Sequence, residues 1–222
     1  MNFSGIFTRL FDKGEIRGTE KCLSVIDMQT FFLSKRPEFI KMCVKKLTVN
    51  IIGEIEFYKD MGYDIMLVEY DDHGDTLPEI KSALGKYRYK LLKKDCSGLM
   101  SSRKHEKRNN EAASIIKSAG SLVELSGVNA TGCVASTAHG FTHIQIKTLL
   151  KLKNTLSVCD YDEFEFMEYN EIGCLIRCLG GDLNNLGEGA LNRGGKVILK
   201  GSYSDIDITG YDPAKHKYAS DL

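Results

Sequence analysis

The feature that most constrains the fold of this chain is a mostly apolar run, Ser121–Leu125, that leads directly into the small-residue stretch Gly127–Ala138. Within that stretch, Cys133 opens a segment that can continue as a helix. A strand that breaks sharply into a helix places its turn at the carboxyl edge of a sheet, where α/β proteins bind ligands. A cysteine in the first helical turn also faces unpaired backbone N–H groups and the positive end of the helix dipole, which favour a thiolate. Cys133 is therefore either a reactive nucleophile or a small buried thiol.

Short apolar runs typical of buried strands recur along the chain and alternate with segments of helical spacing. Besides the run at 121–125, we predict strands at 23–26, 64–69, 87–92, 155–159 and 196–200. We predict helices from 39 to about 62, at 78–84, from 109 to about 120, from 133 to about 152 and at 164–179. This alternation is typical of an α/β sandwich with a largely parallel sheet. Because no repeat or linker divides the chain, we expect a single domain over residues 1–222.

Composition and charge exclude several classes of partner. The 30 basic and 30 acidic side chains cancel, so we expect neither nucleic acid nor a membrane surface as a general partner. No apolar run approaches the roughly 20 residues of a membrane-spanning helix, and the charged segment at the start of the chain is not expected to be a signal peptide. The seven cysteines include no CxxC pair, which predicts reduced thiols and a cytoplasmic location.

Three residues at the ends of predicted strands form a coherent chemical set. Asp27, Lys93 and Cys133 follow separate strands, and the carboxyl ends of parallel strands meet at one edge of a sheet. Asp27 would act as the general base that takes the thiol proton and returns it to a leaving amine. Lys93 would lower the pKa of the thiol, and Cys133 would attack a carbonyl to form a thioester.

The residues around this set resemble one known family. Val25–Phe32 resembles the Asp-x-Gln strand end of the isochorismatase-like cysteine hydrolases, and Lys93–Leu99 resembles their lysine segment. Gly127–Ala138 resembles their nucleophile segment. The resemblance implies a three-layer α/β/α sandwich with a six-stranded, mostly parallel sheet. It also implies a triad of Asp27, Lys93 and Cys133.

The same resemblance implies roles for further residues. Lys93 is preferred over Lys94 as the triad lysine because its spacing to Ser97 matches the family motif. A cis peptide is expected before Asn129, with the backbone N–H groups of Asn129 and Cys133 forming an oxyanion hole. Phe32 is expected to line the substrate pocket, and Gln29 is expected to bind substrate or to support the site.

Neither a metal nor an organic cofactor is expected. Asp71 and His73 could supply two metal ligands, since carboxylate and imidazole suit zinc or iron. Nicotinamidases of the family bind a metal through an Asp-x-His pair and a second histidine, but no further histidine lies at a matching distance here. The glycine-rich residues 180–195 lack the third glycine of a dinucleotide fingerprint and do not follow a strand.

Three functions remain open from the sequence. The first is a metal-independent hydrolase that cleaves an amide, carbamoyl or ureido C–N bond of a small molecule through a thioester. The second is an isochorismatase-type vinyl-ether hydrolase, in which Asp27 is the acid and no cysteine is needed. The third is a catalytically silent binding or scaffold protein, which the basic run Lys86–Arg108 would suit. The resemblance also implies a homo-oligomer.

Overall fold

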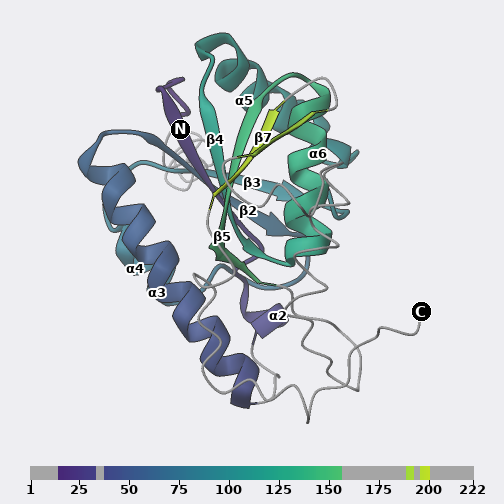
Figure 1. The fold of residues 1–222 in the computed structure, drawn as a ribbon. Helices are drawn as coiled ribbons and strands as arrows, with labels where there is room; N and C mark the ends of the chain where they lie inside the picture. The colour runs from purple at the N-terminus through teal and green to yellow at the C-terminus, as the bar shows by residue number, and fades with distance from the viewer. Residues whose placement is uncertain (1–14, 34–37, 157–188, 193–195, 201–222) are drawn as a thin grey trace, which may run out of the picture.

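A seven-stranded sheet forms the centre of the computed structural model (Figure 1), which describes residues 15–33, 38–156, 189–192 and 196–200. The strand order is β3-β2-β1-β4-β5-β7-β6. The first six of these strands run parallel, and β6 at the edge is antiparallel to β7. The strands are β1 (Lys21–Ile26), β2 (Asp64–Tyr70), β3 (Lys90–Lys94), β4 (Leu122–Val128), β5 (Lys147–Leu156), β6 (Gly189–Asn192) and β7 (Lys196–Lys200). The predicted parallel sheet of six strands is confirmed, and β6 is an addition.

Helices cover both faces of the sheet, as the α/β/α sandwich requires. The long helix α3 and the short α4 lie on one face, and α5 and α6 lie on the other (Figure 1). No helix of the described ranges has the length and apolarity needed to cross a bilayer. The helical elements are α2 (Thr30–Leu33), α3 (Glu38–Asp60), α4 (Pro78–Leu84), η1 (Leu99–Ser101), α5 (Glu106–Ala119), η2 (Ala130–Val134) and α6 (Ala135–His143).

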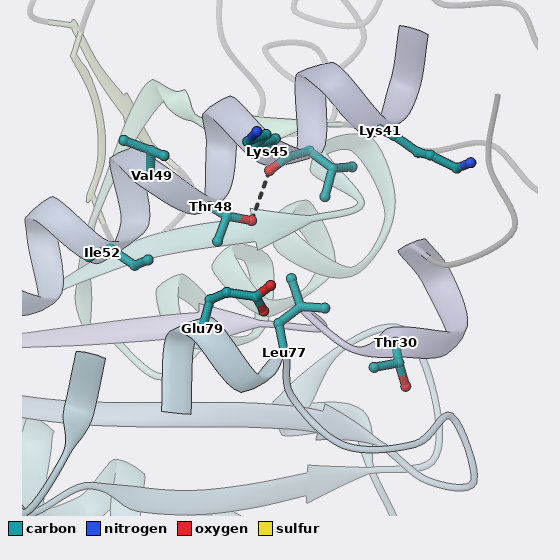
Figure 2. Close-up of a pocket in the computed structure, with 9 residues that line it drawn as sticks. Thr30, Lys41, Lys45, Thr48, Val49, Ile52, Leu77 and Glu79 are labelled. Atoms are coloured by element: carbon teal, nitrogen blue, oxygen red, sulfur yellow. Dashed lines mark hydrogen bonds between the residues drawn. The ribbon is translucent and has the colours of Figure 1, made fainter. Parts of the chain in front are cut away.

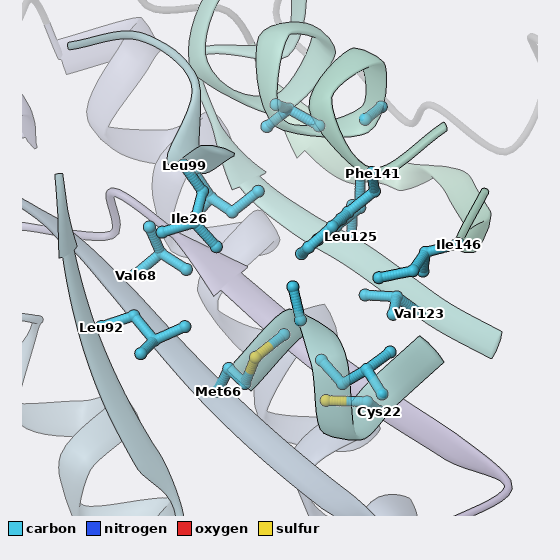
Figure 3. Close-up of a cluster of buried hydrophobic side chains, with 14 of the residues drawn as sticks. Cys22, Ile26, Met66, Val68, Leu92, Leu99, Val123, Leu125, Phe141 and Ile146 are labelled. Atoms are coloured by element: carbon cyan, nitrogen blue, oxygen red, sulfur yellow. The ribbon is translucent and has the colours of Figure 1, made fainter. Parts of the chain in front are cut away.

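Alternate residues of each central strand supply two separate cores. Toward α5 and α6, Ile26, Val68 and Leu125 pack with Phe141 of α6 (Figure 3). Toward α3 and α4, neighbouring strand residues such as Leu23 and Leu67 pack on the helices instead. Complete burial of each such side chain contributes about 1.5–3 kcal/mol. Burial on both faces explains why the strands are almost continuously apolar in sequence.

The segment after α6 differs from the sequence prediction. We predicted that the helix would continue to about residue 152, but α6 ends at His143 and β5 begins at Lys147. Gln145 adopts a left-handed backbone with φ 67°, and the N–H of Ile146 closes the helix end by donating to Phe141 O at 2.9 Å. A short apolar run does not by itself distinguish a helix from a strand. The predicted strand at 155–159 is described only to Leu156, and the predicted helix at 164–179 lies outside the described residues.

Gly127 brings the backbones of β1 and β4 together immediately before the nucleophile segment. Its φ is 123°, in a region that L side chains rarely adopt. A Cβ atom at this position would lie 2.0 Å from Ile26 O, so no larger residue fits without displacing β1. The glycine therefore sets the distance between the strand that leads to Asp27 and the strand that leads to Cys133.

Candidate active site

Three side chains converge at the carboxyl edge of the sheet, and one of them is Lys94. Asp27 follows β1, Lys94 is the last residue of β3, and Cys133 lies in η2 directly after β4. Asp27 Oδ2 accepts a hydrogen bond from Lys94 Nζ at 2.8 Å, and both side chains are 0% exposed. Cys133 is 7% exposed, and its thiol is close enough to interact with both charged groups. Topology thus gathers residues that are about 100 positions apart in sequence.

The preference for Lys93 was wrong, because it is Lys94 that reaches Asp27. Alternate residues of a strand point to opposite faces, and in β3 it is Leu92 and Lys94 that are buried. The Lys93 side chain is 44% exposed, and its Nζ lies 4.0 Å from Glu69 Oε2. The predicted strand ends at Leu92, which places Lys93 directly after it. Counting two residues onward from buried Leu92 would have selected Lys94.

The Lys94 ammonium has three kinds of neighbour. It donates to Asp27 Oδ2 at 2.8 Å and to the carbonyl oxygen of Cys96 at 3.2 Å. It also lies 4.4 Å from the centroid of the Tyr70 ring. Charge-assisted hydrogen bonds of this length are about twice as strong as neutral ones, and burial removes the competing water. The ammonium is therefore fixed between the general-base candidate and an aromatic face.

The electrostatics of the site favour a neutral thiol over a standing thiolate. Burial, and then the Asp27 charge, raise the pKa of Cys133 to about 11, although Lys94 acts in the opposite direction. Burial also raises the pKa of Asp27 above its usual value, against the lowering effects of Lys94 and the Cys133 thiol. The lysine thus lowers the pKa of the thiol as expected, but burial and the Asp27 charge outweigh this effect. Asp27 Oδ1 has no hydrogen-bond partner among the described residues, so it is available to receive the thiol proton.

The backbone around Cys133 forms a tight turn between β4 and α6. The peptide bond between Val128 and Asn129 is cis. One π-helical turn, η2, follows, in which the N–H groups of Gly132 and Val134 both donate to Asn129 O at 3.1 Å. Short π-helical segments are frequent at functional sites. The turn delivers Cys133 to the start of α6 with its side chain directed into the core cluster that contains Ile26 and Leu99.

The side-chain amide of Gln29 joins the residues after β1 to the backbone at the end of β2. It is fully buried, and its Oε1 accepts a hydrogen bond from the Tyr70 N–H at 2.7 Å. Its Nε2 donates to Tyr70 O at 3.0 Å and to Gly74 O at 2.6 Å. Since these bonds commit the amide to backbone groups, the structure gives Gln29 a supporting role and corrects its assignment as a substrate-binding residue.

Phe32 belongs to an aromatic cluster next to the charged pair. Its ring stacks on the His73 ring with a centroid distance of 4.8 Å and an interplanar angle of 19°. The Tyr70 ring lies 6.3 Å from Phe32, and Tyr70 in turn covers the Lys94 ammonium. Phe31 is 58% exposed and meets His73 edge-on at 4.4 Å. The cluster is thus continuous from the charged pair to the molecular surface.

Asp71 and His73 are bonded to nearby loop groups, Asp71 through its carboxylate and His73 through one ring nitrogen. Asp71 Oδ2 accepts hydrogen bonds from Lys104 Nζ at 2.6 Å and is 2.9 Å from His105 Nε2, and these contacts lower the pKa of Asp71. His73 Nδ1 is bonded to the carbonyl oxygen of Asp71 at 2.6 Å. Nowhere in the described ranges do three or more His, Cys, Asp or Glu side chains gather as metal ligands. No local pattern predicts that Lys104 and His105 contact Asp71, because the contact joins two loops that are distant in sequence.

A separate groove of about 410 Å³ lies between α3 and α4 (Figure 2). Asp27, Lys94 and Cys133 do not line it, so it is distinct from the candidate active site. Figure 2 shows that Thr48 Oγ1 donates to the main-chain oxygen of Val44, which leaves the methyl group of Thr48 among the apolar lining. The lining residues are Thr30, Lys41, Val44, Lys45, Thr48, Val49, Ile52, Leu77 and Glu79.

Solved structures share this architecture at low sequence identity. The MAR1 ribonuclease from Caenorhabditis elegans has a TM-score of 0.55 at 16% identity, covering 77% of this chain and 79% of that chain. The pyrazinamidase of Pyrococcus horikoshii, solved in complex with zinc, has a TM-score of 0.52 at 15% identity, covering 82% and 99%. An isochorismatase-like hydrolase from Alkaliphilus metalliredigens has a TM-score of 0.50 at 17% identity, covering 64% and 84%.

The chain has the isochorismatase-like hydrolase fold. No protein-family model matches the sequence, and no curated protein matches it. One isochorismatase-like fold accommodates proteins named for different activities, here a ribonuclease and a pyrazinamidase. The chemistry of this member must therefore be argued from its own side chains.

Proposed function

We propose that this protein is a cysteine hydrolase that cleaves a C–N bond of a small amide, carbamoyl or ureido compound through a thioester on Cys133. The observation that carries the proposal is the buried Asp27–Lys94 pair, 2.8 Å apart, with the Cys133 thiol beside it. Burial of two charges is costly unless each has a partner, and a nucleophile next to such a pair is typical of an active site. The shared fold of the pyrazinamidase supports the same class of reaction.

The proposed reaction begins with one proton on the Asp27–Cys133 pair. Asp27 Oδ1 takes the proton from Sγ as Sγ attacks the substrate carbonyl carbon, and the backbone N–H groups of Asn129 and Cys133 receive the developing oxyanion. Asp27 then gives the proton to the leaving nitrogen, the C–N bond breaks, and a thioester remains. Water attacks the thioester while Asp27 takes a proton from it, and the proton returns to Sγ as the acid leaves. Lys94 balances the negative charge throughout.

A screen with matched cysteine variants tests this proposal. Small amides, carbamoyl compounds and ureido acids are incubated with the protein, and ammonia release is measured. We expect turnover of at least one compound by the unchanged protein and by Cys96→Ala, because the Cys96 side chain is not assigned a step. We expect no turnover by Cys133→Ala, and quenched reactions of the unchanged protein should carry an acyl mass on the Cys133 peptide. Full turnover by Cys133→Ala would rule out the thioester route.

The pH dependence should be that of a pair that shares one proton. On the acid side, kcat/KM should fall as Asp27 is protonated and the Asp27–Cys133 pair gains its second proton, at a pH above the ordinary pKa of Asp27 because burial raises that pKa. On the alkaline side, kcat/KM should fall near pH 11, where the Cys133 thiol loses the proton that the leaving nitrogen needs. Between these limbs the rate should be flat. A pH–rate profile that rises steadily from pH 7 to 9 would instead indicate a thiol that must lose its proton to solvent before it attacks.

A vinyl-ether hydrolase is the second candidate. The raised pKa of Asp27 favours it, because a buried carboxyl that holds its proton can act as a general acid. In that reaction Asp27 would protonate the substrate and Cys133 would be dispensable. The Cys133→Ala variant therefore separates the two candidates, provided that vinyl ethers are included among the compounds and that release of their carbonyl product is measured beside ammonia.

A further inference from the structure

We infer that Tyr70 is a positioning residue that holds the Lys94 ammonium in place for the reaction at Cys133. The inference rests on the proposed function, since it assigns Tyr70 to the same site. It concerns a residue that the sequence motifs do not include. Tyr70 is the last residue of β2, and its Cα is paired with that of Lys94 in the register of β2 and β3.

The Tyr70 ring makes a direct contact with the cation. Lys94 Nζ lies 4.4 Å from the ring centroid, within the range of a cation–π interaction. The lysine side chain is fully buried, so the attraction is not weakened by water. The ammonium donates hydrogen bonds to Asp27 Oδ2 and Cys96 O, and the ring supplies a further favourable surface. A lysine side chain has four flexible methylene groups, and these contacts together restrict it to one position.

Tyr70 itself is fixed unusually well. The Gln29 amide binds both its N–H, at 2.7 Å, and its carbonyl oxygen, at 3.0 Å. The Tyr70 hydroxyl donates to Asp95 O at 3.2 Å, which anchors the far end of the ring. Against the ring lie His73, at a centroid distance of 4.6 Å, and Phe32, at 6.3 Å. Contacts with its backbone, its hydroxyl and one side of the ring therefore hold Tyr70 in place, and the backbone contacts come from the buried amide of Gln29.

Loss of the Tyr70 ring should change the pKa values of Asp27 and Cys133, because both depend on the position of the Lys94 charge. The Lys94 charge lowers the pKa of Asp27 and that of Cys133, and His73 adds a smaller lowering effect on Asp27. If the ammonium shifts toward the Cys96 carbonyl, both pKa values rise and the charge that develops on Sγ is less well balanced. The expected result is a loss in kcat with little change in KM, because Tyr70 is placed next to the catalytic cation.

The test replaces the ring while keeping its shape. Tyr70→Phe, the same position carrying pentafluorophenylalanine, and Tyr70→Leu are compared with the unchanged protein. Fluorination reverses the charge distribution of the ring face with little change in size, so it removes cation attraction without creating a cavity. Tyr63→Leu is the matched control, because Tyr63 lies at the opposite end of β2 and its ring is 5.7 Å from Lys21 Nζ.

The readouts are kcat, KM and the rate of Cys133 alkylation by iodoacetamide across pH, measured by peptide mass mapping. Tyr70→Phe and Tyr63→Leu should stay within about threefold of the unchanged protein, whereas the fluorinated variant and Tyr70→Leu should lose about 10- to 30-fold in kcat. Their alkylation should shift to higher pH. A fluorinated variant with unchanged kcat and an unchanged alkylation profile would overturn the inference, even if Tyr70→Leu fails to fold.

The same measurements separate this inference from the proposed function. Alkylation of Cys133 reports the position of the Lys94 charge and does not require turnover. If the unchanged protein hydrolyses no compound, the proposed function fails, yet a shift in the alkylation profile of the fluorinated variant still supports the role of Tyr70. If hydrolysis is observed and the alkylation profile of the fluorinated variant does not shift, the positioning role of Tyr70 is ruled out and the proposed function stands.

Discussion

Lys94→Ala should lower kcat/KM by about 10²- to 10⁴-fold, whereas Lys93→Ala should leave it within about threefold. The two residues are adjacent, and both substitutions remove one lysine. Only Lys94 Nζ contacts Asp27, at 2.8 Å, and only Lys94 is fully buried. Lys93 is 44% exposed and lies 4.0 Å from Glu69 Oε2, a contact of the kind that contributes between zero and about 1 kcal/mol.

The measurement is kcat/KM on any compound that the screen identifies, with circular dichroism to show that both variants are folded. The pair controls for net charge, because each variant loses a single positive charge from the same strand. A large loss with Lys93→Ala and a small one with Lys94→Ala would contradict the site as the structure places it. Equal losses in kcat/KM for the two variants would indicate that activity depends on the structure of the end of β3 and not on the Lys94 ammonium in particular.

Lys94→Met should reduce the free energy of unfolding by about 3–5 kcal/mol at neutral pH, because it leaves the Asp27 carboxylate buried without its partner. The double variant Asp27→Asn/Lys94→Met removes both charges and should recover most of that loss, since a buried pair replaced as a whole is often neutral in stability. Lys93→Met is the control and should stay within about 0.5 kcal/mol. Urea unfolding of the four proteins measures these differences.

The pH dependence of the same variant has a definite sign. Burial raises the pKa of Asp27 in the folded protein, and Lys94 opposes that increase. In Lys94→Met the pKa of Asp27 should therefore rise further above its unfolded value. A raised folded pKa favours the folded state fully below the unfolded pKa, and this contribution is lost as pH rises through the folded pKa. The stability deficit should thus be small in acid and grow toward neutral pH. A deficit that does not depend on pH would contradict an uncompensated Asp27 charge.

Local patterns were sufficient to place two members of the candidate site. Asp27 directly follows one apolar run and Cys133 follows another after a short turn, and a parallel sheet brings such positions to one edge. The choice between Lys93 and Lys94 depended on where β3 ends, and strand ends are the least certain part of a sequence prediction. Once β3 runs to its observed end, the alternation of side chains decides for Lys94.

Other parts of the site depend on tertiary contacts that no local pattern reveals. Tyr70 becomes important only because β2 and β3 are paired, and Gln29 because its amide reaches the backbone of the next loop. The raised pKa of Cys133 follows from its burial, which a helix-dipole argument does not include. The segment at 147–152 was assigned to a helix because its apolar residues fit either period, and pairing with β4 and β7 makes it a strand.

The two outer strands of the sheet bear on how copies of this protein can associate. An exposed edge strand offers unpaired backbone groups to which another chain can add, and short or lysine-rich edges discourage this. One edge of the described sheet is β6, which has 4 residues, and the other is β3, which has the sequence KLLKK. Neither edge favours strand addition, so a continuous sheet between two copies is disfavoured. Any assembly should instead use the helical layers, and aggregation through edge pairing should be slow.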